Sequence, residues 1–156
     1  MKQLVHAPSF LIQYQQWWAN NRELTVRNVE YAVLILRICS YATQFLPSPT
    51  YPDDKISDLP LGHIRNTCVE LGNSLSETCL ALDWKGGLVR VQHILFAALN
   101  SSCEGRTDMF WEGIASASRA AQKAGVHTAA AELGGAQEFD KEMQRRIFCN
   151  LYLLDR

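Results

Sequence analysis

Apolar residues recur at helical spacing along nearly the whole chain, and no stretch of useful length alternates with the period of a β strand. The first helix has a stripe at i, i+1, i+4, i+7 and i+8, formed by Phe10, Leu11, Tyr14, Trp17 and Trp18. Ser9 is its predicted N-cap and Asn20–Asn21 its predicted end. Adjacent aromatic residues on a helix cannot both face inward, so one of Trp17 and Trp18 is expected to be partly exposed.

A second helix is predicted from its N-cap, Thr25, to about Leu46, where Pro47 ends it because the ring cannot continue the hydrogen-bond ladder. The segment is long enough to cross a bilayer, but it contains three charges that are costly in hydrocarbon, namely Arg27, Glu30 and Arg37. We therefore interpret it as a helix packed in the middle of a bundle. Four of the five prolines lie between Pro47 and Pro60, which predicts a long connection within one domain.

Three more helices follow this connection. The third is predicted from about Gly62 to Leu82, and the fourth from Leu88 to a turn at residues 101–106. Thr107 is the predicted cap of the fifth helix, whose stripe consists of Phe110, Ile114, Ala117, Ala121 and Ala124. After it, a glycine at position 125 suits the left-handed residue that ends many helices, with the next residue, a valine, packing back on the helix.

A sixth helix is predicted from near Glu138, after a stretch of small residues at 128–137. Its inner stripe consists of Phe139, Met143, Ile147, Leu151 and Leu154. Glu142 lies in register with Arg146, four residues on. The stripe reaches the last residues without a helix stop signal, which we interpret as a chain cut inside an element. The predicted fold class is all-α, a bundle of about six helices in a domain that is expected to be incomplete.

Composition narrows the class of protein. A chain of 156 residues predicts one domain, and a net charge of −1 argues against a base-reading surface spread over the whole chain. The five cysteines include no C-x-x-C pair, so neither a structural zinc site nor a disulfide framework is predicted. Four of them fall in apolar helical patterns and are interpreted as small core residues, which favours a reducing compartment.

Motifs that carry catalysis are missing from the sequence. The histidines show neither H-x-x-x-H nor H-E-x-x-H spacing, and there is no G-x-S-x-G nucleophile motif. Two glycine pairs precede predicted helices, but no Walker lysine follows either of them. We therefore predict no catalytic residue, no cofactor-binding residue and no metal ligand, and we predict that the chain is not an enzyme.

Several segments carry a resemblance to a known family. Residues 88–99 (LVRVQHILFAAL) are like its V-Q-A-L-L-L-L-A helix, and residues 115–127 (ASASRAAQKAGVH) are like its A-x-x-x-A-x-x-L-G-L-H helix end. Residues 142–156 (EMQRRIFCNLYLLDR) are like its E-x-R-R-R-x-F/W-W-x-L-Y-x-L-D-R signature, the most specific of these matches. Residues 10–18 are more loosely like its opening F-x-x-x-Y-x-x-W helix. The chain thus resembles the fungal-specific transcription factor domain, the helical regulatory region of activators that carry a six-cysteine, two-zinc DNA-binding cluster.

The resemblance implies that residues 1–156 form the N-terminal part of such a regulatory domain, because the zinc cluster and the later helices do not occur in the sequence. No cofactor is expected in this chain, and zinc is expected only in the missing N-terminal cluster. The implied location is the nucleus. The implied partners are the rest of the parent transcription factor, co-regulators, a small-molecule effector and a second copy of the chain; DNA is reached only through the missing domain, and no membrane is involved.

The signature also implies a set of structural residues in the last helix, namely Arg145, Arg146, Phe148, Leu151, Tyr152, Leu154, Asp155 and Arg156. For the two arginines, contact with nucleic acid is the alternative to a solvated helix face with carboxylate partners, which we favour. Asp155 and Arg156 are each expected to pair with another segment, in a polar network that is buried or half-buried in the intact family domain. Contact with a ligand is the alternative for that pair.

The leading hypothesis is a regulatory domain that senses an effector or binds co-regulators, and that controls RNA polymerase II transcription without reading bases itself. An effector pocket is expected between helices, mostly apolar with a few polar groups. The alternatives are a helical protein-interaction scaffold and a truncated fragment without function. A helical enzyme is disfavoured, because the sequence offers no acid–base pair for a cleft.

Overall fold

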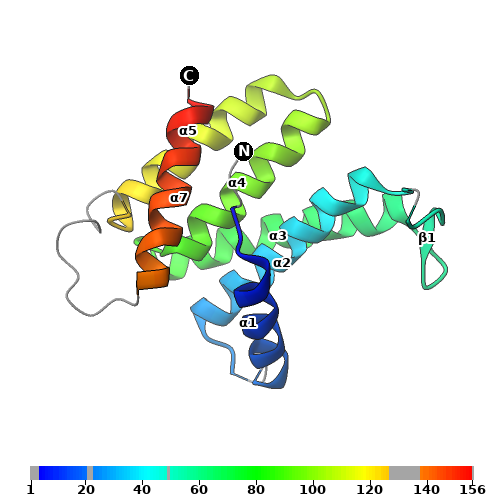
Figure 1. Ribbon diagram of the computed structural model, residues 1–156, viewed down its shortest axis with the longest axis horizontal. Helices are drawn as coiled ribbons and strands as arrows, with labels where there is room; N and C mark the ends of the chain where they lie inside the picture. Colours follow the sequence, from blue (N-terminus) through cyan, green and yellow to red (C-terminus); the bar gives the residue numbers. More distant parts are fainter. Residues whose placement is uncertain (1–3, 21–22, 49, 127–137, 156) are drawn as a thin grey trace.

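The computed structural model describes residues 4–20, 23–48, 50–126 and 138–155. These residues form six α helices, one short 3-10 helix and one two-stranded hairpin (Figure 1), which confirms the predicted all-α class. In chain order the elements are α1 (Ala7–Ala19), α2 (Val26–Ala42), η1 (Thr43–Phe45), β1 (Lys55–Ile56), β2 (Leu59–Pro60), α3 (Leu61–Leu82), α4 (Leu88–Cys103), α5 (Thr107–Lys123) and α7 (Glu138–Leu154). The predicted connection at 128–137 lies outside the described residues.

The hydrophobic core lies where α4, α5 and α7 meet. Val91 and Leu95 of α4, Ile114 of α5 and Ile147 of α7 are fully buried there. Helix α4 also packs on α2, and α2 in turn packs along α3. Figure 1 shows α2 and α3 running side by side away from the core toward the hairpin. The molecule therefore consists of an α4–α5–α7 core and an α2–α3 pair, joined through the contact between α2 and α4.

Helix α1 is attached through its aromatic side chains, and none of its residues is fully buried. The Trp17 indole Nε1 donates to the carbonyl of Asn28 at 3.0 Å. The Tyr31 hydroxyl donates to the carbonyl of Phe10 at 3.1 Å. Trp18 stays 62% exposed, which confirms that only one of the two adjacent tryptophans faces the protein.

Helix starts and ends differ from the predictions by a few residues. The N-cap of α1 is His6 and not Ser9, because the His6 ring accepts from the Ser9 N–H and the proline falls inside the first turn, where it is tolerated. Thr107 is the first residue of α5 and not its cap, and α4 continues to Cys103, into the predicted turn. Thr25 does cap α2, since its hydroxyl accepts from the Asn28 N–H at 3.2 Å.

Two predicted helix ends can be compared directly. Helix α2 ends at Ala42, before the predicted end at Leu46, because the chain tightens into η1 ahead of the proline. The end of α5 is as predicted: Gly125 has φ of 72°, and the Val126 N–H donates to the Ala121 carbonyl at 2.9 Å. This bond and the buried side chain of Val126 complete a glycine-terminated helix end.

The proline-rich connection contains a hairpin that the hydrophobic pattern does not indicate. Lys55 pairs with Pro60 and Ile56 with Leu59. The two residues between the strands, at positions 57 and 58, both have positive φ, which is the geometry of a tight hairpin turn. All four strand residues are exposed, so no buried stripe marks the hairpin in the sequence.

The interpretation of four cysteines as core residues is wrong. Only Cys79 is buried, whereas Cys39 and Cys103 are exposed and Cys68 and Cys149 are half-buried. The burial of α2 explains the position of Cys39. The buried residues of this helix are Glu30, Tyr31, Val33, Leu34, Arg37 and Ser40. They occupy part of the helix circumference, so an apolar run that continues around the helix overestimates how many of its residues are buried.

Helices α4 and α5 approach each other closely at Gly113. A Cβ at this position would lie 2.7 Å from the Cβ of Ala98 and 3.2 Å from its Cα. We expect Gly113→Ala to lower the free energy of unfolding by about 1 kcal/mol, because overpacking costs about 1–3 kcal/mol and the better helix propensity of alanine returns up to about 1 kcal/mol.

Gly62→Ala in the first turn of α3 is the matched control, because a Cβ there meets nothing within 4 Å. This variant is expected to be as stable as the natural chain or more stable by up to about 1 kcal/mol. Urea denaturation of the two variants measures the difference. A Gly113→Ala protein as stable as the Gly62→Ala protein would show that the α4–α5 contact tolerates a side chain.

Candidate functional site: a polar cleft between α3 and α5

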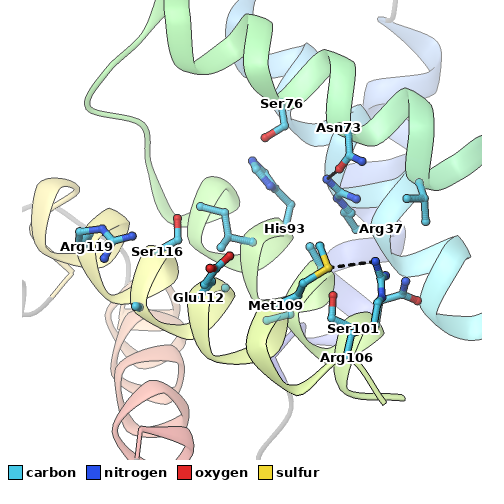
Figure 2. A pocket seen from close by; sticks show the side chains of 17 residues that line it. Arg37, Asn73, Ser76, His93, Ser101, Arg106, Met109, Glu112, Ser116 and Arg119 are labelled. Carbon is cyan, nitrogen blue, oxygen red and sulfur yellow. Dashed lines mark hydrogen bonds between the residues drawn. The ribbon is translucent and has the colours of Figure 1, made fainter. Parts of the chain in front are cut away.

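A cleft of about 640 Å³ opens between α3 and α5, above α4. Its apolar wall is formed by Val69, Ile94, Ala97, Ala98, Met109 and Ala115. Its polar side chains are Arg37, Asn73, Ser76, His93, Asn100, Ser101, Arg106, Glu112, Ser116 and Arg119. Figure 2 shows these groups reaching in from α2, α3, α4 and α5, so the cleft lies between the α2–α3 pair and the core.

Arg37 brings a buried positive charge to the cleft. Arg37 is 8% exposed, and its Nη2 donates to Asn73 Oδ1 at 2.6 Å. Its Nε is buried without a hydrogen-bond partner, and no carboxylate of the described residues pairs with the guanidinium. Burial lowers the pKa of Arg37 from its usual value. Gly72 makes room for this group, since a Cβ there would lie 3.3 Å from Arg37 Nε and Cζ.

His93 is the second buried polar group of the cleft. It is 2% exposed, its Nε2 has no hydrogen-bond partner among the described residues, and Figure 2 shows its ring reaching from α4 toward Ser76 on α3. Burial lowers the pKa of His93 to about 3, and the positive charges of Arg37 and Arg90 add to the effect. The imidazole is therefore neutral at physiological pH.

The outer side of the cleft is charged and open to solvent. Glu112, Ser116 and Arg119 lie at i, i+4 and i+7 on α5, so they share one face of the helix. At the N-terminal end of α5 the Arg106 guanidinium contacts Met109 Sδ at 3.2 Å and forms an ion pair with Glu104. Because these charges are exposed, solvent screens them far more than it screens Arg37.

A buried ion pair connects the helices that form the cleft. Glu30 of α2 pairs with Arg90 of α4, and both residues are at most 5% exposed. The Arg90 guanidinium also donates to the carbonyls of Asp83 and Cys79 at the end of α3. Burial raises the pKa of Glu30, although the charge of Arg90 and its hydrogen bond oppose that shift. This one arginine thus joins α2, α3 and α4, the three helices that position Arg37 and His93.

The predicted signature residues that the structure describes, Arg145 to Asp155, lie on α7 or directly after it, and none of them lines the cleft. Leu151 is buried and Leu154 is half-buried, while Phe148 and Tyr152 are 44% and 54% exposed. Asp155 is exposed at the end of the helix in this chain, and the polar network expected around it in the intact family domain stays a prediction. Arg156 lies outside the described residues, and the structural role of the set stays a prediction.

The two signature arginines have carboxylate partners. Arg145 Nη1 lies 3.0 Å from Glu142 Oε2, and Arg146 Nε lies 2.8 Å from Glu142 Oε1. The second pair is the one predicted from the spacing of four residues. A solvated helix face with carboxylate partners therefore describes these arginines better than a free basic patch.

Sequence reasoning did not identify the cleft. It noted Glu30 and Arg37 only as charges that argue against a membrane span, and it gave His93 no role. The available signal was the position of two charged residues inside an apolar helix, since such residues are buried only when a partner or a ligand compensates them. Which partner each of them meets depends on α3 and α4, which lie far away in the sequence.

None of the described helices combines the length and apolar character needed to cross a membrane. Within the described ranges, no three His, Cys, Asp or Glu side chains gather in a way that fits a metal ion.

Comparison with known proteins identifies the family. The profile of the fungal specific transcription factor domain matches residues 3–156 of the chain. The chain belongs to this family. The domain is thus a transcription factor domain and not an enzyme, as predicted from its sequence.

Two relatives are similar over this whole transcription factor domain. Transcription factor xilB of Penicillium rubens is 58% identical over 161 residues, which cover 99% of this chain and 24% of that protein. Probable transcription factor sol4 of Alternaria solani is 42% identical over 161 residues, covering 100% of this chain and 29% of that protein. The chain thus spans less than a third of the length of each of these relatives. No solved structure matches the domain at significant similarity.

Proposed function

We propose that this domain is the regulatory module of a fungal zinc-cluster transcription factor, which senses an effector or binds co-regulators in the nucleus and thereby controls RNA polymerase II transcription. The observation that carries this proposal is the cleft between the α2–α3 pair and the core, which holds a buried arginine to which none of the described residues supplies a counter-charge. Such a group is costly to maintain unless something binds to it. A regulatory role would explain the buried arginine, because an effector or co-regulator bound in the cleft would compensate its charge.

The domain does not itself read bases in this proposal. Affinity for DNA comes mainly from lysine and arginine side chains that neutralise phosphates, and this chain has a net charge of −1. Arg145 and Arg146 are already engaged with Glu142. DNA contact, and the zinc that supports it, would belong to a cluster elsewhere in the parent protein.

The parent protein also supplies the partner of α7 in this proposal. Phe148, Tyr152 and Leu153 are 44%, 54% and 63% exposed, and together with Cys149 they line a shallow apolar groove. Exposed apolar patches of this kind mark interaction surfaces. We assign this one to the rest of the transcription factor, because the matched relatives are more than three times as long as the chain.

Regulation would act through the packing of the α2–α3 pair against the α4–α5–α7 core. A molecule bound in the cleft touches α3 on one side and α5 on the other, so it favours arrangements in which both lie close. A ligand shifts an equilibrium only by its difference in affinity for the two states. A ligand of the cleft would have such a difference in affinity, because moving the α2–α3 pair away from the core would remove one wall of its binding site.

A tethered reporter tests the proposal. The chain is fused to a heterologous DNA-binding module in a fungal host, and the transcript of a gene carrying that module's site is measured. We expect the transcript level to differ from that obtained with the module alone, because the domain acts on transcription once it is brought to a promoter.

The alternatives predict other outcomes of this experiment and of a separate binding titration with DNA. A protein-interaction scaffold unrelated to transcription, or a fragment without function, leaves the transcript at the level of the module alone while the fusion accumulates normally. A chain that reads bases itself shifts short genomic DNA in a binding titration at physiological salt without the module. Either result would contradict the proposed function.

A further inference from the structure

We infer that the cleft binds a small monocarboxylate with an apolar body, whose carboxylate pairs with Arg37. This inference rests on the proposed function, because it names the chemical class of the effector that the regulatory domain would sense. It is carried by Arg37 and His93, the two polar groups that are more than nine-tenths buried at the cleft and have unpartnered nitrogen atoms.

The charge of the site selects an anion. Arg37 is buried, and arginine side chains stay protonated in proteins. Among the described residues its guanidinium donates to the neutral amide of Asn73 and pairs with no carboxylate. A carboxylate would supply the counter-charge that the described residues do not. The fork of an arginine matches the two oxygens of a carboxylate, which makes such a pair strong when water is excluded.

The charged groups around the cleft limit the ligand to one negative charge near Arg37. Glu112 faces the cleft from α5 and repels a second anionic group. Arg106 is paired with Glu104, and Arg119 is exposed to solvent, so neither is a buried counterpart for a second carboxylate. His93 is neutral and offers a hydrogen bond from or to Nε2, depending on its tautomer.

The apolar wall accounts for the rest of the ligand. Val69 of α3, Ile94 and Ala97 of α4 and Ala115 of α5 line the cleft around the polar groups. Its volume of about 640 Å³ lies within the range of small-molecule sites, which is roughly 300–1,000 Å³. An inorganic anion would leave this wall wet, whereas a molecule with a ring or chain of carbon atoms would cover it.

The test uses a matched pair of probes, 2-naphthoate and its neutral analogue 2-naphthamide, which differ in charge and hardly in shape. Each is titrated into the full chain labelled with ¹⁵N, and amide resonances of α3, α4 and α5 are followed. We expect naphthoate to bind about tenfold more tightly than naphthamide, because hydrogen bonds to charged groups contribute about 1.5 kcal/mol or more.

Arg37→Met removes the charge and keeps the length of the side chain, so it is expected to abolish the preference for naphthoate. The variant is expected to fold at least as stably as the natural chain, because an apolar side chain no longer has a buried charge to desolvate. Arg37→Lys keeps a positive charge and is expected to retain the preference in part. Arg145→Met, the same change at an exposed arginine of α7, is expected to retain it fully.

Three results would overturn the inference. They are equal affinity for both probes, a preference that persists in Arg37→Met, and resonance shifts confined to residues outside the cleft. Failure here is distinguishable from failure of the proposed function. A tethered chain that changes the reporter while naphthoate shows no preference would refute the carboxylate site alone, and would leave the regulatory role standing.

Discussion

Glu30→Met is expected to lower the free energy of unfolding by about 3–5 kcal/mol, the usual cost of removing one member of a buried ion pair. Glu30 and Arg90 are at most 5% exposed, so the substitution leaves the Arg90 guanidinium buried with only the carbonyls of Asp83 and Cys79 as partners. The effect reaches three helices, because Arg90 connects the end of α3 to α2 and α4. Urea denaturation at pH 7 measures it.

A double variant and a control separate the buried pair from its parts. Glu30→Met combined with Arg90→Met is expected to recover part of the loss, because no charge then remains buried without a partner. Glu142→Met breaks the ion pairs of α7, where the side chain of Glu142 is 39% exposed, and is expected to cost at most about 1 kcal/mol. Equal losses for Glu30→Met and Glu142→Met would show that the Glu30–Arg90 pair does not stabilise the fold.

Acidification from pH 7 to pH 5 is expected to destabilise the domain by about 2 kcal/mol through His93 alone. The pKa of His93 is about 3 in the folded chain, against 6.5 for a free imidazole, so between these values the unfolded chain binds more protons. The stability that His93 contributes is therefore complete above pH 6.5 and is lost as the pH falls toward 3. The charges of Arg37 and Arg90 face the ring and act in the same direction.

His93→Phe removes this titration while keeping a ring in the buried site. Denaturation of both proteins at pH 7, 6 and 5 gives the pH dependence that belongs to His93 as their difference. Glu30 acts in the opposite direction, because burial raises its pKa, but it is present in both proteins and cancels. Parallel pH profiles for the natural chain and His93→Phe would mean that the ring is protonated or solvated in the folded state.

The spacing of apolar residues was sufficient to predict the helices. The middle of the predicted stripe on α7, Met143, Ile147 and Leu151, is buried, because a helix in a small domain must bury one face. At the two ends of the stripe, Leu154 is half-buried and Phe139 is 37% exposed. The end of α5 at Gly125 was predictable for a local reason, since a glycine in the left-handed conformation satisfies the last carbonyls. Caps were harder to predict, because several side chains near a helix start compete for the same N–H groups, as His6 and Ser9 do.

The cleft could not be predicted from the sequence, because its residues meet only in the folded chain. Arg37 and Asn73 are 36 positions apart, and Glu30 and Arg90 are 60 positions apart. Gly72 reads as a weak point of α3 in the sequence, yet in the structure its missing side chain leaves room for the Arg37 guanidinium. None of these residues indicates a site by itself, because the site forms only when the folded chain brings them together.

The most specific segment of the family resemblance lies away from the cleft. The most specific motif lies on α7, whose Phe148 and Tyr152 point to solvent and whose arginines pair with Glu142. A signature of this kind identifies the domain but does not locate its cleft. The cleft and the signature lie on separate elements, so variants such as Arg37→Met and Arg145→Met test them independently.

The transcript produced by a tethered reporter, compared between the natural chain, Glu30→Met and Glu142→Met, tests the central claim most directly. If the folded domain acts on transcription, the natural chain and Glu142→Met change the reporter equally, and Glu30→Met loses the effect because the helices that form the cleft come apart. The account is contradicted if all three fusions accumulate and the reporter stays at the level of the DNA-binding module alone.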